Sequence, residues 1–528
     1  MQLRALPLGF VLAVGVAAAA APPTEEKIPL YEGLGLYHRA ITTTSTKAQG
    51  YFDQGMMLGY AFGRPEAVKS FRAAQEEDAA CAICAWGEAW ALGPYINEEM
   101  EEDAAAEAFA AIRKAQDRQT SATDAERGLI AAMARRYAED PAKAKRDALD
   151  LDYTAAMRDL WKQYPEDDDI ASLFAEALMV LHPWDLYPGG TPRPEVTEAV
   201  AVLETVLARD LRDPGACHLY IHAVEASAAP GRAEACADLL SEGIPLGSHI
   251  QHMPSHIYMR IGRYADAVRA NQHAHMVDDM AKAGKAVAIY PGHNLHMLWY
   301  AAWMDGQSAV ALQAALDLGE EDGPPSQEYL LGLARFGRWD ELIALKKGPR
   351  VPFDEGIWSF ARGLAFLRSG DVKKARKALA RLDRLAAVAD PEKTFSPRSK
   401  DGPIDILRIA QGILAGEMAA AAGDRDAAVR HLEAAVVAED ALEYSEPERW
   451  PIPARQVLGG VLLEIERPAD AKRIYEEDLV DHPENGWSLF GLAESLKALG
   501  EEERAAGVEK RFTQAWARSD LRLTSSRF

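Results

Sequence analysis

Apolar residues recur at helical spacing along most of the chain, and the breaks between these stretches fall at glycine–polar pairs. Such pairs are Gly262-Arg263, Gly306-Gln307, Gly337-Arg338, Gly370-Asp371 and Gly423-Asp424. Because glycine tolerates the left-handed conformation with which many helices end, each break predicts the end of one helix and the start of the next. We find no run that alternates as a strand does, and even the Val-rich segment 199–207 keeps a helical period. The pattern predicts an all-α fold.

Several of these helix–turn–helix units carry small and aromatic residues where the two helices would cross. In the first clear unit, Gly59-Tyr60 precedes Phe71 and Trp86-Gly87; in the last, Ala471-x3-Tyr475 precedes Trp487 and Gly491. This pattern resembles the tetratricopeptide (TPR) unit. Because stacked hairpins bury one continuous core, we expect a TPR-like α-solenoid, that is, one superhelix of stacked hairpins.

The length of 528 residues, far more than one small core needs, agrees with a repeat array. We divide the chain into a signal peptide (1–21), an N-terminal TPR-like region (22–200), a His-rich region (201–310) and a C-terminal TPR-like array (311–528). Three proline-rich loops interrupt the helices, at 182–194, 391–403 and 446–453. In a helical array such loops often line the concave face or the rim of a pocket.

The N-terminus reads as a secretory signal. Arg4 precedes an apolar segment from Leu8 to Val16, and an alanine run then offers cleavage sites before Pro22. The apolar segment is too short to favour an uncleaved anchor, and no later stretch is long enough to span a bilayer. We therefore expect a periplasmic or secreted protein without a membrane span.

The net charge of −23 argues against a nucleic-acid or anionic-membrane surface, because both need clustered lysine and arginine. It identifies no partner, and a small-molecule or peptide ligand and the oligomeric state both stay open. The four cysteines allow two pairs, Cys81 with Cys84 and Cys217 with Cys236. In an oxidising compartment each pair can form a disulfide, and packed free thiols are an equal alternative.

Nine of the thirteen histidines lie between His218 and His296. Residues three or four apart share a helix face, so three pairs can each direct two imidazoles one way. These pairs are His218/His222, His252/His256 and His293/His296. A single pair is more often packing than a ligand set, but three nearby pairs favour convergence on a metal. All nine cannot bind one ion, and we expect His249, His273 and His275 to be bystanders.

Imidazole ligands suit zinc, copper, iron and nickel. A secreted chain meets zinc and copper most easily, with iron as a third option. Six histidines would hold two ions with three ligands each, whereas Glu225 with two or three histidines would hold one zinc with an open position. Glu225 would serve as a ligand, as a general base, or as a carboxylate that orients a histidine ring.

Other polar residues are candidates for the same cavity. Glu176 lies in an apolar run, where an unpaired carboxylate would be costly to bury, so it is either paired or catalytic. The candidate substrate-binding residues are Trp184, Asp185, Tyr258, Tyr290 and Arg455. For each of these, packing or surface pairing is the more frequent role.

Longer motifs resemble a family of secreted bacterial TPR-repeat proteins. They are His218-Leu-Tyr-Ile-His222-Ala-Val-Glu225, His252-Met-Pro-Ser-His256, Pro291-Gly-His293-Asn-Leu-His296, Asn485-Gly-Trp487 and the final Ser526-Arg527-Phe528. The resemblance spans nearly the whole chain after the signal segment. It implies a TPR-like all-helical fold and no particular reaction.

Two functional hypotheses follow from the sequence. The first is a secreted TPR-like metalloprotein, an enzyme whose metal lies inside the superhelix and which catalyses hydrolysis or, with copper or iron, oxidation. The second is a non-catalytic TPR scaffold for a peptide or protein partner, in which the histidines only pack. Glycine-rich phosphate loops, a Gly-x-Ser-x-Gly elbow and a His-Glu-x-x-His motif are absent from the sequence, so nucleotide-binding, serine-hydrolase and zincin functions have little support.

Overall fold

The computed structural model describes residues 28–100, 102–319, 323–396 and 399–528. The predicted signal peptide lies outside the described residues. Within them the fold is all-α, and the β-type pairing consists of a single bridge between Gly247 and Val287. No helix in this part of the chain is both long and apolar enough to cross a membrane.

The helices follow one another with short connections. The first region contains α1 (Thr46–Tyr60), α2 (Arg64–Glu77), α3 (Ala82–Ala91), α4 (Glu102–Arg118), α5 (Asp124–Met133), α6 (Arg146–Gln163), α7 (Asp168–Val180) and α8 (Pro194–Arg209). The His-rich region contains α9 (Pro214–Val224), α10 (Glu234–Gly243), α11 (Ser248–His252), α12 (Pro254–Arg260), α13 (Tyr264–Lys282) and α14 (Pro291–Met304). The rest contains α15 (Ser308–Leu318), α16 (Gln327–Arg335), α17 (Trp339–Ala344), α18 (Pro352–Arg368), α19 (Val372–Val388), α20 (Pro403–Ala421), α21 (Arg425–Asp440), α22 (Ala454–Glu464), α23 (Pro468–Asp481), α24 (Gly486–Ala498) and α25 (Glu502–Ala515). Four short 3₁₀ turns complete the described elements: Gln119–Ser121, Pro141–Lys143, Pro188–Gly190 and Pro230–Ala233.

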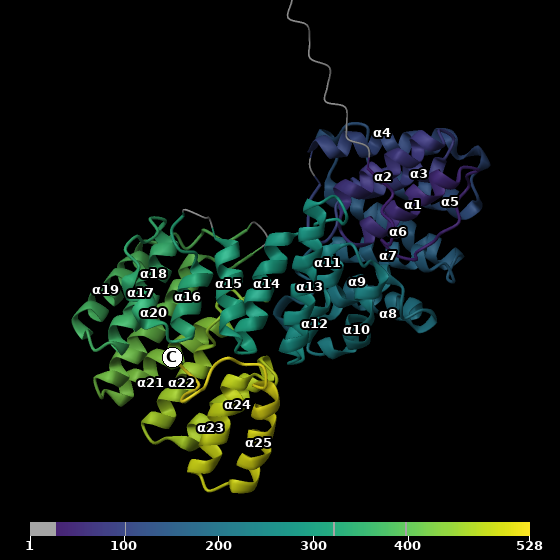
Figure 1. Cartoon of the computed structure of the whole chain (residues 1–528). Coiled ribbons are helices and arrows are strands. Elements are labelled where there is room, and N and C mark those ends of the chain that lie inside the picture. Colours follow the sequence, from purple (N-terminus) through teal and green to yellow (C-terminus); the bar gives the residue numbers. More distant parts are fainter. Residues whose placement is uncertain (1–27, 101, 320–322, 397–398) are drawn as a thin grey trace, which may run out of the picture.

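Successive helices pack against each other along the chain, so the protein is a TPR-like α-solenoid, as the sequence predicts. Figure 1 shows the stack running from the purple N-terminal helices through the teal His-rich region to the green and yellow C-terminal helices. The glycines at the predicted breaks have the expected backbone, with φ of 82° at Gly262 and 71° at Gly306. Buried apolar side chains form one continuous cluster from Ile28 to Val508, so the array is not divided into separate globules.

The C-terminal end of the solenoid folds back onto its middle. The hydroxyl of Tyr264 donates to the carbonyl of Pro483 at 2.9 Å. The carboxylate of Asp520 accepts from the backbone N–H groups of Ser308 and Ala309, at 2.8 and 2.9 Å. These contacts join segments more than 200 residues apart.

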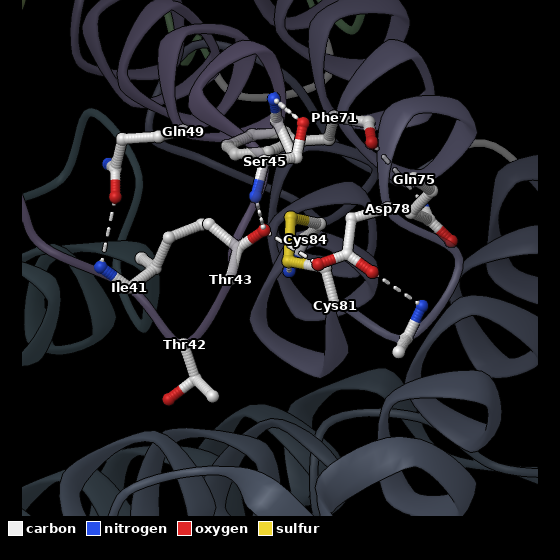
Figure 2. The surroundings of a disulfide bond; sticks show 12 residues. Ile41, Thr42, Thr43, Ser45, Gln49, Phe71, Gln75, Asp78, Cys81 and Cys84 are labelled. Carbon is white, nitrogen blue, oxygen red and sulfur yellow. Dashed lines mark hydrogen bonds between the residues drawn. A yellow bond between two sulfur atoms is a disulfide. The ribbon is translucent and has the colours of Figure 1, made fainter.

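Both cysteine pairs form disulfides. Cys81–Cys84 lies at the start of α3, close to Asp78, whose carboxylate accepts from the hydroxyl of Thr43 at 2.6 Å (Figure 2). Cys217–Cys236 joins α9 to α10, with a Cα–Cα distance of 5.2 Å. The second disulfide therefore ties α9 to α10 at the residue directly before His218.

Small residues at helix crossings set how closely the helices of this array approach. The fully buried ring of Tyr475 on α23 lies between Gly459 on α22 and Gly491 on α24. A Cβ atom at either glycine would overlap the ring. Gly507 in α25, by contrast, is exposed and has no atom within 4 Å of the place that a Cβ would take.

We therefore expect Gly491→Ala and Gly507→Ala to change stability in opposite directions. Gly491→Ala should lower the free energy of unfolding by about 1–3 kcal/mol, because the ring must move within a packed core. Gly507→Ala should raise it by about 0.5–1 kcal/mol, because alanine favours the helix. Thermal and urea denaturation followed by circular dichroism measure both changes, and equal effects of the two substitutions would contradict this packing.

Candidate metal centre

Four helices direct histidines toward one buried volume. His218 and His222 lie one turn apart on α9, whose first turn is capped by the carboxylate of Asp213. His249 and His252 lie on α11, His256 lies on α12, and His293 lies in the first turn of α14. The first five of these side chains are almost fully buried, and His293 is partly buried.

The first group of ligand atoms is formed by His218, His222 and His249, in which one nitrogen of each ring lies within 4.8 Å of the others. His218 Nδ1 lies 2.5 Å from the backbone carbonyl of Tyr60, which can only accept, so this nitrogen carries the proton. His222 Nδ1 lies 2.9 Å from the carboxylate of Glu225 and donates to it. In these tautomers both Nε2 atoms carry lone pairs, and they face each other at 3.2 Å.

His249, which we expected to be a bystander, lies with this group. Its side chain is buried, and neither ring nitrogen has a hydrogen-bond partner in the described protein. The ring lies 5.0 Å from that of His218 and packs edge-on against Tyr290, with the ring centroids 5.2 Å apart. A buried imidazole without partners loses its hydration and gains nothing in return, so it requires a physical reason.

The second group is formed by His252, His256 and His293. His252 Nδ1 lies 2.7 Å from Oδ1 of Asn271, whose amide nitrogen donates to the carbonyl of Ala267. Asn271 therefore accepts from His252, which leaves a lone pair on His252 Nε2. This atom lies 2.7 Å from His256 Nε2. The ring centroid of His293 lies 4.7 Å from that of His252.

Two carboxylates orient these rings. The oxygens of Glu225 accept from His222 Nδ1 and, at 2.7 Å, from His256 Nδ1, so this side chain joins the two groups. Glu446, in the loop 446–453, forms a second short ion pair with His256 Nδ1. Glu225 and Glu446 are both nearly fully buried. Hydrogen bonds from Nδ1 to a carboxylate are typical of histidines that bind a metal through Nε2.

Burial and charge divide the protonation states of these histidines. Burial lowers the pKa of His222 to about 3, with a further contribution from His256, and burial and His222 lower the pKa of His218 well below its usual range. Burial, with a further contribution from His256, likewise lowers the pKa of His293 to about 3. Burial also acts on His256, but the carboxylates of Glu446 and Glu225 outweigh it and raise its pKa to about 10. At neutral pH His218 and His222 are therefore neutral.

The histidine groups lie on the wall of a cavity of about 1410 Å³. His222, His249, His256 and His293 line this cavity. All three proline-rich loops also contribute to its wall, as expected from the sequence, through Trp184–Gly190, through Phe395, Ser396 and Ser399–Asp401, and through Glu446–Arg449 with Pro451. The cavity therefore joins the N-terminal and C-terminal halves of the superhelix at the histidines.

The remaining candidate residues divide into those that line the cavity and those that do not. Trp184, Asp185, Tyr290 and His296 line it, although His296 lies outside both histidine groups, 3.7 Å from Glu328. His273 is exposed and His275 partly exposed.

Three candidates are engaged elsewhere. Glu176 is paired with Arg64 and accepts from the indole of Trp90 at 2.8 Å, which is the paired alternative for a buried carboxylate. Tyr258 donates to Asp238 at 2.7 Å, and Arg455 pairs with Asp440. None of these three side chains is among the residues that line the cavity.

Comparisons with known proteins add little to this geometry. No family model and no curated protein matches the chain. Among solved structures, a human IFIT1 dimer with m7Gppp-AAAA is 12% identical, covers 90% of this chain and 92% of its own, and has a TM-score of 0.32. Yeast Tom70 is 12% identical, with 90% of each chain covered and a TM-score of 0.27. Because both TM-scores are so low, we infer nothing about this chain from these two structures. The class that the helix packing defines is a TPR-like helical repeat protein, and the resemblance to a secreted bacterial family stays a prediction.

The geometry predicts opposite effects of two substitutions in chelator-treated protein. His249→Leu should leave the melting temperature unchanged or raise it, because it replaces buried polar atoms that have no partners, each costing about 1–3 kcal/mol. His222→Leu should lower the free energy of unfolding by about 1.5–3 kcal/mol, because the buried, charged carboxylate of Glu225 loses the hydrogen bond from His222. Calorimetry of both variants measures this difference, and a strongly destabilising His249→Leu would show that His249 has a structural partner.

Proposed function

We propose that this chain is a metal-dependent enzyme whose transition-metal ion is bound by His218, His222 and His249, with the substrate entering through the adjoining cavity. The observation that carries the proposal is the contact between two lone pairs: His218 Nε2 and His222 Nε2 face each other at 3.2 Å in a buried site. Since both Nδ1 atoms hold the ring protons, neither Nε2 has a hydrogen to donate to the other. A cation between them removes the repulsion.

The distances fit a tetrahedral ion. Two nitrogens at about 2.0–2.1 Å from one zinc lie about 3.3 Å apart at a tetrahedral angle. The 3.2 Å separation of the two Nε2 atoms is close to this value. His249, with both nitrogens free of protein partners, supplies the third ligand. We propose zinc or copper as the ion, with iron as a third option, because all three accept imidazole.

Three protein ligands leave a coordination position open for catalysis. His222 and His249 line the cavity, so the fourth position faces it. Zinc there would supply an acidic bound water for hydrolysis, and copper or iron would supply electron transfer for oxidation. Glu225 holds His222 in the binding tautomer, and Trp184, whose ring contacts that of His222 at a centroid distance of 5.9 Å, bounds the substrate space.

The proposed location is the periplasm or the outside of the cell. The two disulfides support it, because disulfides persist mainly in oxidising compartments. Zinc and copper are also the metals that such a protein meets most easily.

The second candidate is a scaffold that binds a peptide or protein partner. The TPR-like superhelix and the size of the cavity favour it, since both halves of the chain contribute to one large concave surface. In that case the histidines would bind no ion and the cavity alone would hold the partner.

Metal binding is tested with native protein purified without an affinity tag. We expect stoichiometric zinc or copper and, after chelation, a melting temperature that rises again when the metal is added, because an ion bound only by the folded state stabilises it. His218→Ala should weaken this response, because one group of histidine ligands is incomplete, and His275→Ala, outside the site, should keep it in full. Protein without a stoichiometric transition metal, whose melting temperature ignores added zinc and copper, would falsify the proposal.

An open position is tested separately with cobalt(II) in place of the native ion. Azide should change the visible spectrum of cobalt-substituted protein, because it enters the fourth position from the cavity. A spectrum that stays constant up to high azide would indicate a closed, structural site and would contradict a catalytic role for the ion.

A further inference from the structure

The second histidine group is built from residues separate from those of the first. His252, His256 and His293 come from α11, α12 and α14, and one nitrogen of each lies within 4.8 Å of the others. Asn271 fixes the tautomer of His252, and Glu225 with Glu446 fixes the proton of His256 on Nδ1. None of these three rings belongs to the first group, and His293 forms no hydrogen bond within the described residues.

We propose that His252, His256 and His293 bind a second transition-metal ion beside the first, which makes the site a two-metal centre. The proposal rests on the proposed function for its first ion only. It differs from the arrangement predicted by sequence in one ligand, because His249 takes the place of His296.

The two groups are in direct contact. The ring centroids of His249 and His252 lie 5.5 Å apart, and those of His222 and His256 lie 5.6 Å apart. Glu225 spans the groups, since one oxygen accepts from His222 and the other from His256. Two ions held by such groups are near neighbours that share one orienting carboxylate.

The charges of the site also favour two cations. Glu225 and Glu446 are both buried, and within the described residues no lysine or arginine pairs with either carboxylate. Arg260 donates to the backbone carbonyl of Glu225 and not to its carboxylate. Buried carboxylates require compensating positive charge, which cations bound by the adjacent histidines would supply.

Both ions would face the same cavity, because residues of each group line it. Two neighbouring metal ions can bind one oxygen donor between them, and each ion then stabilises part of the negative charge on that oxygen. The ligand class that fits is a small oxygen donor, such as hydroxide or the oxygen atom of a substrate, bridging the two metals.

A proton is the competing occupant of the second group. The 2.7 Å separation of His252 Nε2 and His256 Nε2 is shorter than the roughly 3.3 Å between two nitrogens on a tetrahedral zinc. It suits an N–H···N hydrogen bond from a charged His256. If the proton occupies this position, the protein binds one ion and the second histidine group is an internal ion pair.

The number of bound ions separates these alternatives. Chelated protein is loaded with zinc, dialysed and analysed for metal, and we expect two equivalents. His293→Ala should bind one, and this variant should fold, because the side chain is partly exposed and takes part in no hydrogen bond of the described chain. His218→Ala should also bind one, His218→Ala/His293→Ala should bind none, and His275→Ala should bind two.

Copper(II) tests whether the sites are neighbours. In the native protein the integrated electron paramagnetic resonance signal should account for less than the total copper, because adjacent bridged ions couple. In His293→Ala the signal should equal the copper content. One zinc equivalent in native protein would overturn the second site and leave the proposed function standing, whereas none would overturn both. Two equivalents that persist in His293→Ala, or two uncoupled coppers, would overturn the location assigned here.

Discussion

The carboxylate of Glu225 is the group on which the geometry of the histidine cluster depends. It lies at the C-terminal end of α9 and accepts from one ring of each group, so it sets the proton position on His222 and His256 together. Its backbone carbonyl is in turn held by Arg260 at 3.1 Å, and α9 is tied to α10 by Cys217–Cys236. An acceptor at this point turns two Nε2 atoms inward, which no amount of helix packing alone would achieve.

The solenoid supplies what a single hairpin cannot, namely a wall built from distant parts of the chain. The loop 446–453 brings Glu446 to His256, although 190 positions of sequence separate them, and Phe62 from the connection between α1 and α2 packs on His218 at a centroid distance of 4.3 Å. The cavity thus has one side from the first repeats and the other from the last third of the chain. A continuous core holds both sides in place.

The helical array and the two histidine pairs could be predicted from sequence, because helix period and i,i+4 spacing are local properties. The structure places His249, and not His296, beside these pairs. His249 lies three residues before His252, the same spacing that had favoured His296, but its position on the short helix α11 was not evident. Glu446, Asn271 and the carbonyl of Tyr60 could not be identified, since each meets its histidine only through the stacking of helices. The proline-rich loop that carries Glu446 was the one available signal, and it pointed to a pocket rather than to a partner.

The contacts that fold the last repeats back onto the middle change the mechanics of the array. When each repeat of a TPR-like stack contacts only its neighbours, the stack can lengthen by small changes at every interface. Here hydrogen bonds of Asp520 and Pro483 join the C-terminal repeats to α13 and α15. The C-terminal half of the stack therefore forms a closed loop of contacts. Stretching this half of the stack therefore requires these hydrogen bonds to break as well as the interfaces between neighbouring repeats.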